Sequence, residues 1–284
     1  MTIETTRSEN PAGSHSVAVV HLIRRGNPDR FLRRFLSSYA THPAGLPHDP
    51  VFLLKGFDEA EATRLQRRIS KRVGGHPSFI RIDDQGFDIG AYKYAAERLD
   101  HMFVVFLNSH SEILCDRWLA RLISAFSSHP DAGIAGAAGN WETLDAGIPF
   151  PNVHLRSNAF AVRRLDFLAL DFGPLDTKRA CNEFEAGPRS MTRQMLERGL
   201  QPYVVGRDGS VFAKEGWPES GTFRSGRQEN LLVADNRTRD FAEGSTRHRQ
   251  KVAGLSWGER SRPAPLGIVE RAAVALRRLL TGRF

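Results

Sequence analysis

Several features that would assign the chain to a membrane, secreted or metal-binding class are absent from it. Among its 284 residues, no apolar run reaches the roughly 20 residues that a membrane-spanning helix requires. The opening segment MTIETTRSENPAGSHS carries no apolar stretch of a secretory signal, and we expect residues 1–15 to be a disordered N-terminus. The two cysteines, Cys115 and Cys181, match no metal-ligand spacing and indicate a reducing, cytoplasmic setting.

The familiar cofactor and nucleophile motifs are absent as well. The sequence contains no Gly-x-Gly-x-x-Gly after its first apolar run and no glycine-lysine phosphate loop. It also contains no His-Glu-x-x-His and no Gly-x-Ser-x-Gly. These absences argue against a dinucleotide-dependent dehydrogenase, a P-loop NTPase and an α/β-hydrolase.

The net charge of +8 raises the question of a nucleic-acid partner, but most of this charge lies in the tail. Residues 241–284 hold nine Lys and Arg against three Asp and Glu, which leaves about +2 for residues 1–240. The sequence also lacks zinc-finger spacings and an aromatic-rich platform for single strands. We therefore expect no nucleic-acid partner.

Strand-like and helix-like segments alternate over the first half of the chain. Apolar, β-branched runs predict strands, and apolar residues at helical spacing behind capping residues predict helices. This alternation is typical of an α/β fold with a mostly parallel sheet and helices on both faces. The predicted strands are 16–23, 49–56, 78–84, 101–108 and 132–138, and the predicted helices are 27–42, 58–73, 88–99 and 116–129.

After residue 140 the alternation stops. We expect one domain over residues 16–240, followed by a linker over 241–265 that is rich in Arg, Ser, Gly and Gln. Residues 266–284 predict a short, basic amphipathic helix, which either packs on the domain or lies on an anionic membrane. The other expected elements are a strand leading into a helix over 154–170, a helix over 187–199 and a strand over 201–206.

The segment VVFLNSHSEIL, residues 104–114, is an apolar strand that opens directly into ligand-type side chains. In a mostly parallel sheet, small molecules bind at the carboxyl ends of the strands. Arg24 and Lys55 lie at the ends of the first and second predicted strands, so both are candidate partners of a diphosphate. With the motifs named above absent, nucleotide-sugar chemistry is the common remaining use of such a sheet.

The chain resembles a family of bacterial sugar transferases. The segments GFDIGAY (86–92), FLNSH (106–110) and RQENLLVADNRT (227–238) are similar to those of the rhamnan-synthesis type of glycosyltransferase, which has the GT-A fold. The similarity covers about residues 16–240. It implies a GT-A-like, Rossmann-like α/β domain that moves a sugar from a nucleotide-sugar donor to a hydroxyl group.

The resemblance also implies a role for Asn108, Ser109 and His110. In most GT-A enzymes an Asp-any-Asp motif at this position holds a divalent cation, Mg or Mn, against the donor diphosphate, but both acids are missing here. In one alternative the enzyme needs no metal, and His110 or arginines donate to the diphosphate. In the other, Glu112 supplies an anionic ligand beside His110 and a metal is retained. The missing acids favour the first.

Two carboxylates are candidates for the general base that the resemblance implies. In related inverting transferases an acid about one helix before a glycine deprotonates the acceptor hydroxyl. Counting back from Gly199 favours Glu185, with Glu183 as runner-up, although both acids could instead cap the following helix. Asp88 would contact the nucleoside or cap its own helix, and Arg156 would contact the acceptor or the donor sugar.

These residues predict an inverting glycosyltransferase that acts at the inner face of the cytoplasmic membrane. Its acceptor would be a bacterial surface polysaccharide or a lipid-linked glycan. The alternative is a non-catalytic binding or scaffold protein of the same fold that has lost the acidic metal motif.

Overall fold

The computed structural model describes residues 16–276, except residues 85, 86, 144–146, 269, 271, 273 and 275. The predicted disordered segment 1–15, Gly86 of the GFDIGAY segment and residues 277–284 of the predicted C-terminal helix lie outside the described residues.

The central feature of the fold is an eight-stranded sheet in the order β11-β10-β6-β9-β4-β1-β2-β3. β9 runs antiparallel to β4 and β6, and β11 runs antiparallel to β10, whereas the remaining neighbours pair in parallel. The predicted α/β fold with a mostly parallel sheet is therefore confirmed. The strands are β1 (Val17–Arg24), β2 (Asp49–Lys55), β3 (Ser78–Ile82), β4 (Phe103–Leu107), β6 (Ala132–Gly136), β9 (Ala159–Arg163), β10 (Gln201–Val205) and β11 (Val211–Ala213).

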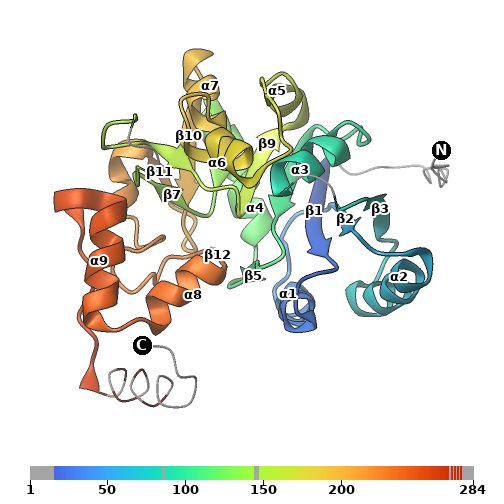
Figure 1. Ribbon diagram of the computed structural model, residues 1–284, viewed down its shortest axis with the longest axis horizontal. Helices are drawn as coiled ribbons and strands as arrows, with labels where there is room; N and C mark the ends of the chain where they lie inside the picture. Colours follow the sequence, from blue (N-terminus) through green and yellow to red (C-terminus); the bar gives the residue numbers. More distant parts are fainter. Residues whose placement is uncertain are drawn as a thin grey trace.

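Helices cover both faces of this sheet, as predicted. Figure 1 shows α1 and α2 on one side of the strands and α3 and α5 on the other. Because both faces are covered, β1 is buried from Val17 to Ile23 and reads as one continuous apolar run apart from His21. One face packs on α1 (Asp29–Thr41), α2 (Glu59–Val73) and α4 (Trp118–Ser128); the other packs on α3 (Asp88–Ala96), α5 (Arg164–Leu168), α6 (Lys178–Ala186) and α7 (Met191–Glu197).

Two short strand pairs extend the carboxyl ends of the central strands. β5 (Glu112–Ile113) pairs with β12 (Val233–Ala234), and β7 (Gly139–Asn140) pairs with β8 (His154–Leu155). The β5–β12 pair joins residues that are about 120 positions apart, so the segment that leads into the C-terminal helices contacts the segment that follows β4.

The prediction of a linker over residues 241–265 is wrong for the central part of this segment. This segment contains α9 (Thr246–Trp257), which follows α8 (Asn236–Glu243) and buries Val252, Ala253 and Trp257. Arg249 is also buried, with its guanidinium 4.7 Å from the ring centre of Phe241. Arginine covers apolar surface with its stem and its planar head. The composition rich in Arg, Ser, Gly and Gln, from which we predicted a linker, therefore includes a packed helix.

The apolar side chains described between Leu266 and Leu276 are partly buried and partly exposed. Leu266 and Val274 are buried, whereas Ile268 and Leu276 are 80% and 58% exposed. Within the described residues, no helix is both long enough and apolar enough to span a membrane.

The contact between Gly139 and Trp217 provides a test of this packing. A Cβ atom at Gly139 would lie 2.2 Å from Cε3 of the fully buried Trp217. We expect Gly139→Ala to lower the free energy of unfolding by roughly 1–3 kcal/mol, because a tightly packed core resists added volume. Chemical denaturation of the purified variant measures this change.

Gly254→Ala is the matched control. A Cβ at Gly254, inside α9, meets no atom within 4 Å. Alanine has the higher helix propensity, so this substitution should stabilise the protein by up to about 1 kcal/mol. Equal effects of the two substitutions would contradict the packing described here.

Candidate functional site

The side chains predicted as site residues lie mostly at one edge of the sheet, where the parallel strands end. We call this the carboxyl edge. Because β9 is antiparallel, its beginning rather than its end lies at this edge, beside the end of β4. The backbone N–H of Asn108, after β4, donates to the carbonyl of Asn158, before β9, at 3.0 Å. The loops 108–111 and 156–158 are thus held together.

Asp88 lies at this edge among charged side chains from three other elements. It is the first residue of α3, whose N-cap is Phe87, and no side chain caps this helix, so Asp88 is not a capping residue. Its pKa is raised by burial first and then by the negative charge of Glu185, against the opposing effects of Lys55 and Arg24. Asp88 is therefore a carboxylate held close to a second carboxylate and to two cations.

Lys55 and Arg24, the two predicted diphosphate partners, end neighbouring strands β2 and β1. Lys55 is 2% exposed, and burial lowers the pKa of its ammonium group against the field of nearby acids, chiefly Asp84. Arg24 makes two hydrogen bonds to Asp84, at 2.9 and 3.1 Å, and both side chains are about half exposed. Asp84 thus fixes the position of the Arg24 side chain at the solvent-exposed part of the carboxyl edge.

Glu185 and Glu183 differ sharply in their surroundings. Glu185, near the end of α6, accepts hydrogen bonds from the backbone N–H of Ser157, at 3.0 Å, and from the Ser157 hydroxyl. Glu183 is exposed and pairs with Arg179, one helical turn earlier. The cap of the next helix, α7, is Ser190, so neither acid caps it. Glu185 alone of the two faces the carboxyl edge.

Arg156 is held by a buried ion pair. Its Nη2 donates to Oδ2 of Asp235 at 2.7 Å, with the two side chains 11% and 0% exposed. Asp235 also caps α8 by accepting the N–H of Thr238 at 2.8 Å. Burial alone would raise the pKa of Asp235, but Arg156 and Thr238 outweigh it and hold the pKa below its ordinary value.

The 108–111 loop is shaped by Asn108. Its Oδ1 accepts the backbone N–H of His110 at 2.9 Å, which closes a tight turn. The ring of His110 packs against Phe31, with 4.5 Å between ring centres, and its carbonyl accepts from Arg239 of α8 at 2.9 Å. Burial is the main cause that lowers the pKa of His110, so its imidazole is neutral near pH 7.

The residues at the predicted metal position do not fit a hard divalent cation. Glu112 is engaged by two arginines, at 2.9 Å by Arg239 and at 3.5 Å by Arg34. Oδ1 of Asn108 is engaged by its own loop, and a neutral imidazole prefers softer metals. Over the part of the chain that is described, no group of three or more His, Cys, Asp or Glu side chains is arranged to hold a metal ion.

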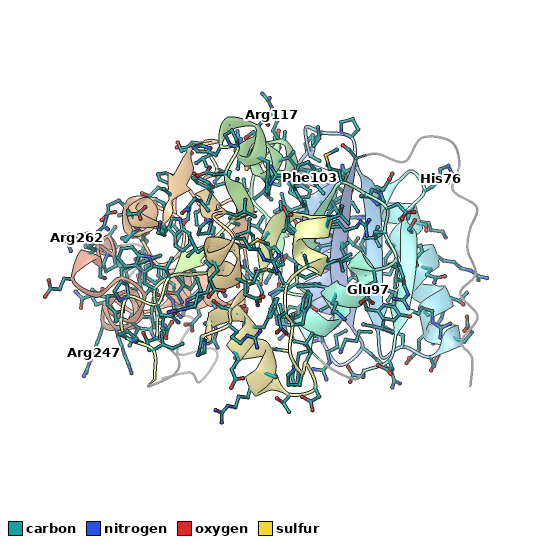
Figure 2. The ribbon with its side chains drawn as sticks, turned by 90° about the horizontal axis from the view of Figure 1, so that it is seen from above. His76, Glu97, Phe103, Arg117, Arg247 and Arg262 are labelled. Atoms are coloured by element: carbon teal, nitrogen blue, oxygen red, sulfur yellow. The ribbon has the colours of Figure 1, made fainter. Side chains whose placement is uncertain are left out.

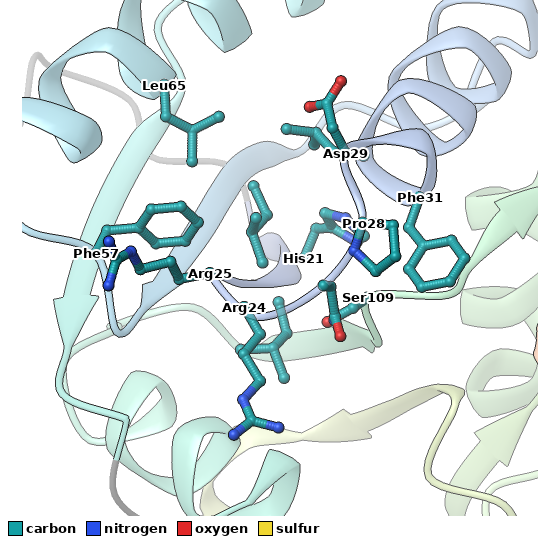
Figure 3. A pocket seen from close by; sticks show the side chains of 13 residues that line it. His21, Arg24, Arg25, Pro28, Asp29, Phe31, Phe57, Leu65 and Ser109 are labelled. Atoms are coloured by element: carbon teal, nitrogen blue, oxygen red, sulfur yellow. The ribbon is translucent and has the colours of Figure 1, made fainter.

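A cavity of about 180 Å³ opens beside the end of β1. Figure 3 shows Phe31 and Phe57 on opposite sides of it, with Arg24 and Ser109 at the side nearest the carboxyl edge. His21 lines its floor and stacks on Phe35, with 3.5 Å between ring centres. Burial lowers the pKa of His21 to about 3, so this imidazole is neutral at physiological pH.

Sequence reasoning missed several residues at the carboxyl edge. His21 interrupts an otherwise apolar strand, and that interruption was the available signal. Ser157 and Arg239 carry no sequence signal of their own, because each acts through a partner far away in the chain. Tyr92, one turn after Asp88, is buried with its hydroxyl without a partner among the described residues, and burial, Asp88 and Glu185 raise its pKa.

Comparisons with known proteins give a fold-level likeness only. No protein-family model and no curated protein matches the sequence. Among solved structures, GalNAc-T7 with UDP, GalNAc and Mn2+ is 15% identical with a TM-score of 0.39, covering 53% of this chain and 35% of that one. CMP:2-keto-3-deoxy-manno-octonic acid synthetase complexed with CTP is 12% identical with a TM-score of 0.42, covering 66% and 89%. S. aureus TarS is 13% identical with a TM-score of 0.37, covering 52% and 28%. Likeness at this level carries no argument about activity.

The raised pKa of Asp88 predicts how stability depends on pH. A carboxyl that binds its proton more tightly in the folded state contributes stability at low pH and loses it as the pH rises through the raised pKa. We therefore expect Asp88→Asn to raise the melting temperature near neutral pH, and the gain to shrink below about pH 4, near the ordinary pKa of aspartate. Thermal denaturation across this range measures it.

Asp84→Asn is the control with the opposite sign. The hydrogen bond from Arg24 lowers the pKa of Asp84, so this substitution should slightly lower the melting temperature near neutral pH and not at acid pH. If Asp88→Asn destabilised the protein more at neutral than at acid pH, the electrostatic description of Asp88 would be wrong.

Proposed function

We propose that the protein is a glycosyltransferase that moves a sugar from a nucleotide-sugar donor to an acceptor hydroxyl. One observation carries the proposal. Glu185 is fixed by Ser157 at the same carboxyl edge that presents Arg24, Lys55 and an adjoining cavity beside β1. A positioned carboxylate close to cationic side chains and to a ring-lined cavity suits attack by a hydroxyl on a phosphate-activated carbon.

The cavity beside β1 supports a place for the donor's nucleoside. Its aromatic walls, Phe31 and Phe57, suit a flat ring, and a neutral His21 offers a hydrogen-bonding edge without a charge. Arg24 lies where the cavity meets the carboxyl edge, so the donor's phosphates would extend from the cavity toward Lys55 and the 108–111 loop. Asp88 would then hydrogen-bond a hydroxyl of the ribose or of the sugar.

Glu185 would act as the general base. Its carboxylate takes the proton of the acceptor hydroxyl while the oxygen attacks the anomeric carbon and the nucleoside diphosphate leaves from the other side. Attack opposite the leaving group inverts the configuration at that carbon, so we propose an inverting reaction. Two hydrogen bonds from Ser157 orient the carboxylate for this role.

Glu185→Gln tests this assignment against Glu183→Gln. General-base catalysis contributes roughly 10²- to 10⁴-fold to a rate, so we expect Glu185→Gln to lower the release of nucleoside diphosphate by at least about 100-fold. Glu183 is solvent-exposed on the same helix, and its amide variant should keep full activity. Both variants should bind UDP-, GDP- or dTDP-sugars as the unsubstituted protein does, in isothermal titration.

Two negative results of this experiment would lead to different conclusions. If none of the nucleotide-sugars binds at millimolar concentration, the donor site is wrong. If one binds but Glu185→Gln restores a polysaccharide-deficient strain as well as the unsubstituted protein, the chain is a non-catalytic binding or scaffold protein.

We propose that the acceptor is a bacterial surface polysaccharide or a lipid-linked glycan, reached from the cytoplasmic side of the membrane. The C-terminal region supports this placement. Arg247, Lys251 and Leu255 follow one another at four-residue spacing on the exposed side of α9, and Figure 2 shows Arg247 and Arg262 at that outer end of the molecule. With exposed Ile268 and Leu276, this end combines positive charge and apolar side chains, as an anionic lipid surface requires.

Vesicle co-sedimentation tests the membrane contact. We expect the protein to sediment with vesicles that contain phosphatidylglycerol and not with phosphatidylcholine alone, and to be released by salt. The pair Ile268→Ser and Leu276→Ser should reduce sedimentation several-fold. Leu165→Ser, at a residue that is 70% exposed on α5, is the matched control and should change nothing. Equal sedimentation with neutral vesicles would argue against the contact.

A further inference from the structure

Buried polar atoms without hydrogen-bond partners gather where the loops 108–111 and 156–158 meet. Among the described residues they include Nη1 of Arg156, Nδ2 and Oδ1 of Asn158, and Nδ1 of His110. Asn158 is only 2% exposed, yet neither atom of its amide is paired. A buried amide without hydrogen bonds is unfavourable, and native proteins rarely tolerate one without a reason. The arrangement indicates a polar ligand.

The three side chains are connected through short structural links. The carbonyl of Asn158 accepts the N–H of Asn108, which begins the turn that carries His110. Arg239 donates to the carbonyl of His110, and its own N–H donates to the carbonyl of Asp235, the partner of Arg156. The negative charge of Asp235 is also among the groups that affect the pKa of His110. All three side chains therefore belong to one small region.

The guanidinium of Arg156 is held in place and keeps one nitrogen, Nη1, to donate to an anion. One nitrogen of the guanidinium is fixed by Asp235, and its flat face lies 4.3 Å from the ring centre of Phe223. This geometry leaves Nη1 as a directed donor whose position does not depend on a ligand. A guanidinium held in this way suits the tetrahedral oxygens of a phosphate.

We propose that Arg156, with Asn158 and His110, binds the donor's diphosphate and takes the place of a divalent cation. This inference rests on the proposed glycosyltransferase function. As the acceptor oxygen bonds to the anomeric carbon, the bond from that carbon to the diphosphate oxygen breaks and its electron pair stays on that oxygen. The acceptor proton goes to Glu185, and the new negative charge on the diphosphate is stabilised by the N–H of Arg156.

The ion pairs around Glu112 agree with this assignment. Glu112, the carboxylate that directly follows the 108–111 loop in sequence, is held by Arg239 and Arg34. A cation would have to displace both arginines, and it would enter a region where Arg156 is already positively charged. The arginines Arg34, Arg156 and Arg239 outnumber the carboxylates Glu112 and Asp235, so positive charge for a phosphate is built into the chain.

Binding of inorganic pyrophosphate in the presence of EDTA tests the inference on the full-length protein. Arg156→Ala would strand Asp235 as a buried, unpaired carboxylate, so the informative variants are Arg156→Lys and Asn158→Ala. Asn158→Ala removes an amide that has no hydrogen-bond partner among the described residues, and it should not lower the melting temperature. We expect both variants to weaken pyrophosphate binding by tenfold or more, as when one directed donor to an oxyanion is lost. EDTA should change neither binding nor donor turnover.

Arg163→Lys is the matched control. Arg163 lies at the other end of β9, away from the carboxyl edge, and also packs its guanidinium on aromatic rings, so its variant should bind pyrophosphate normally. No pyrophosphate binding, loss of binding on adding EDTA, or unchanged affinity in both test variants would overturn the inference. Arg156-dependent pyrophosphate binding in a protein that takes up no nucleotide-sugar would support this anion site while refuting the proposed function.

Discussion

The antiparallel direction of β9 is the constraint on which the carboxyl edge depends. A parallel strand between β4 and β6 would place residues 156–158 at the opposite end of the sheet. Because β9 is reversed, the loop before it lies beside the loop after β4, and one hydrogen bond between Asn108 and Asn158 joins them. Glu185, through Ser157, and Asp235, through Arg156, are both attached to this junction.

Charged side chains at the carboxyl edge are paired with opposite charges of the chain itself. Arg24 is matched by Asp84, Arg156 by Asp235, and Glu112 by Arg239. Buried charges require such partners, since an isolated charge in the interior carries a large desolvation penalty. Two polar side chains are not balanced in this way. The pKa of Asp88 is raised beside Glu185. The amide of Asn158 has no hydrogen-bond partner in the part of the chain that is described. Both belong to the region where we place the donor.

The alternating first half of the chain made its architecture predictable, and the second half did not. The strands β1, β2, β4 and β6 each carry a buried apolar run, and α2 begins with a full capping box at Asp58, so local sequence and tertiary structure agree there. The predicted linker failed at α9, because its buried side is made of small residues, Trp257 and an arginine packed on Phe241. The positions of Arg24, Lys55, Asp88 and Asn108 at the carboxyl edge were predictable. Arg24 and Lys55 end strands, Asn108 follows one, and Asp88 begins a helix after one.

The order of residue types along the chain therefore determined the α/β class and the strand ends at which ligand-type residues appear. It also determined the order of strands and helices to residue 140, apart from the short strands β5 and β7. These features follow from hydrophobic periodicity and capping, which act between neighbours in sequence. Only the tertiary structure decided that Glu185 rather than Glu183 faces the carboxyl edge, that Glu112 is bound by two arginines, and that Arg156 pairs with Asp235. Those outcomes depend on ion pairs and hydrogen bonds between residues 28 to 127 positions apart, for which the sequence carries no periodic signal.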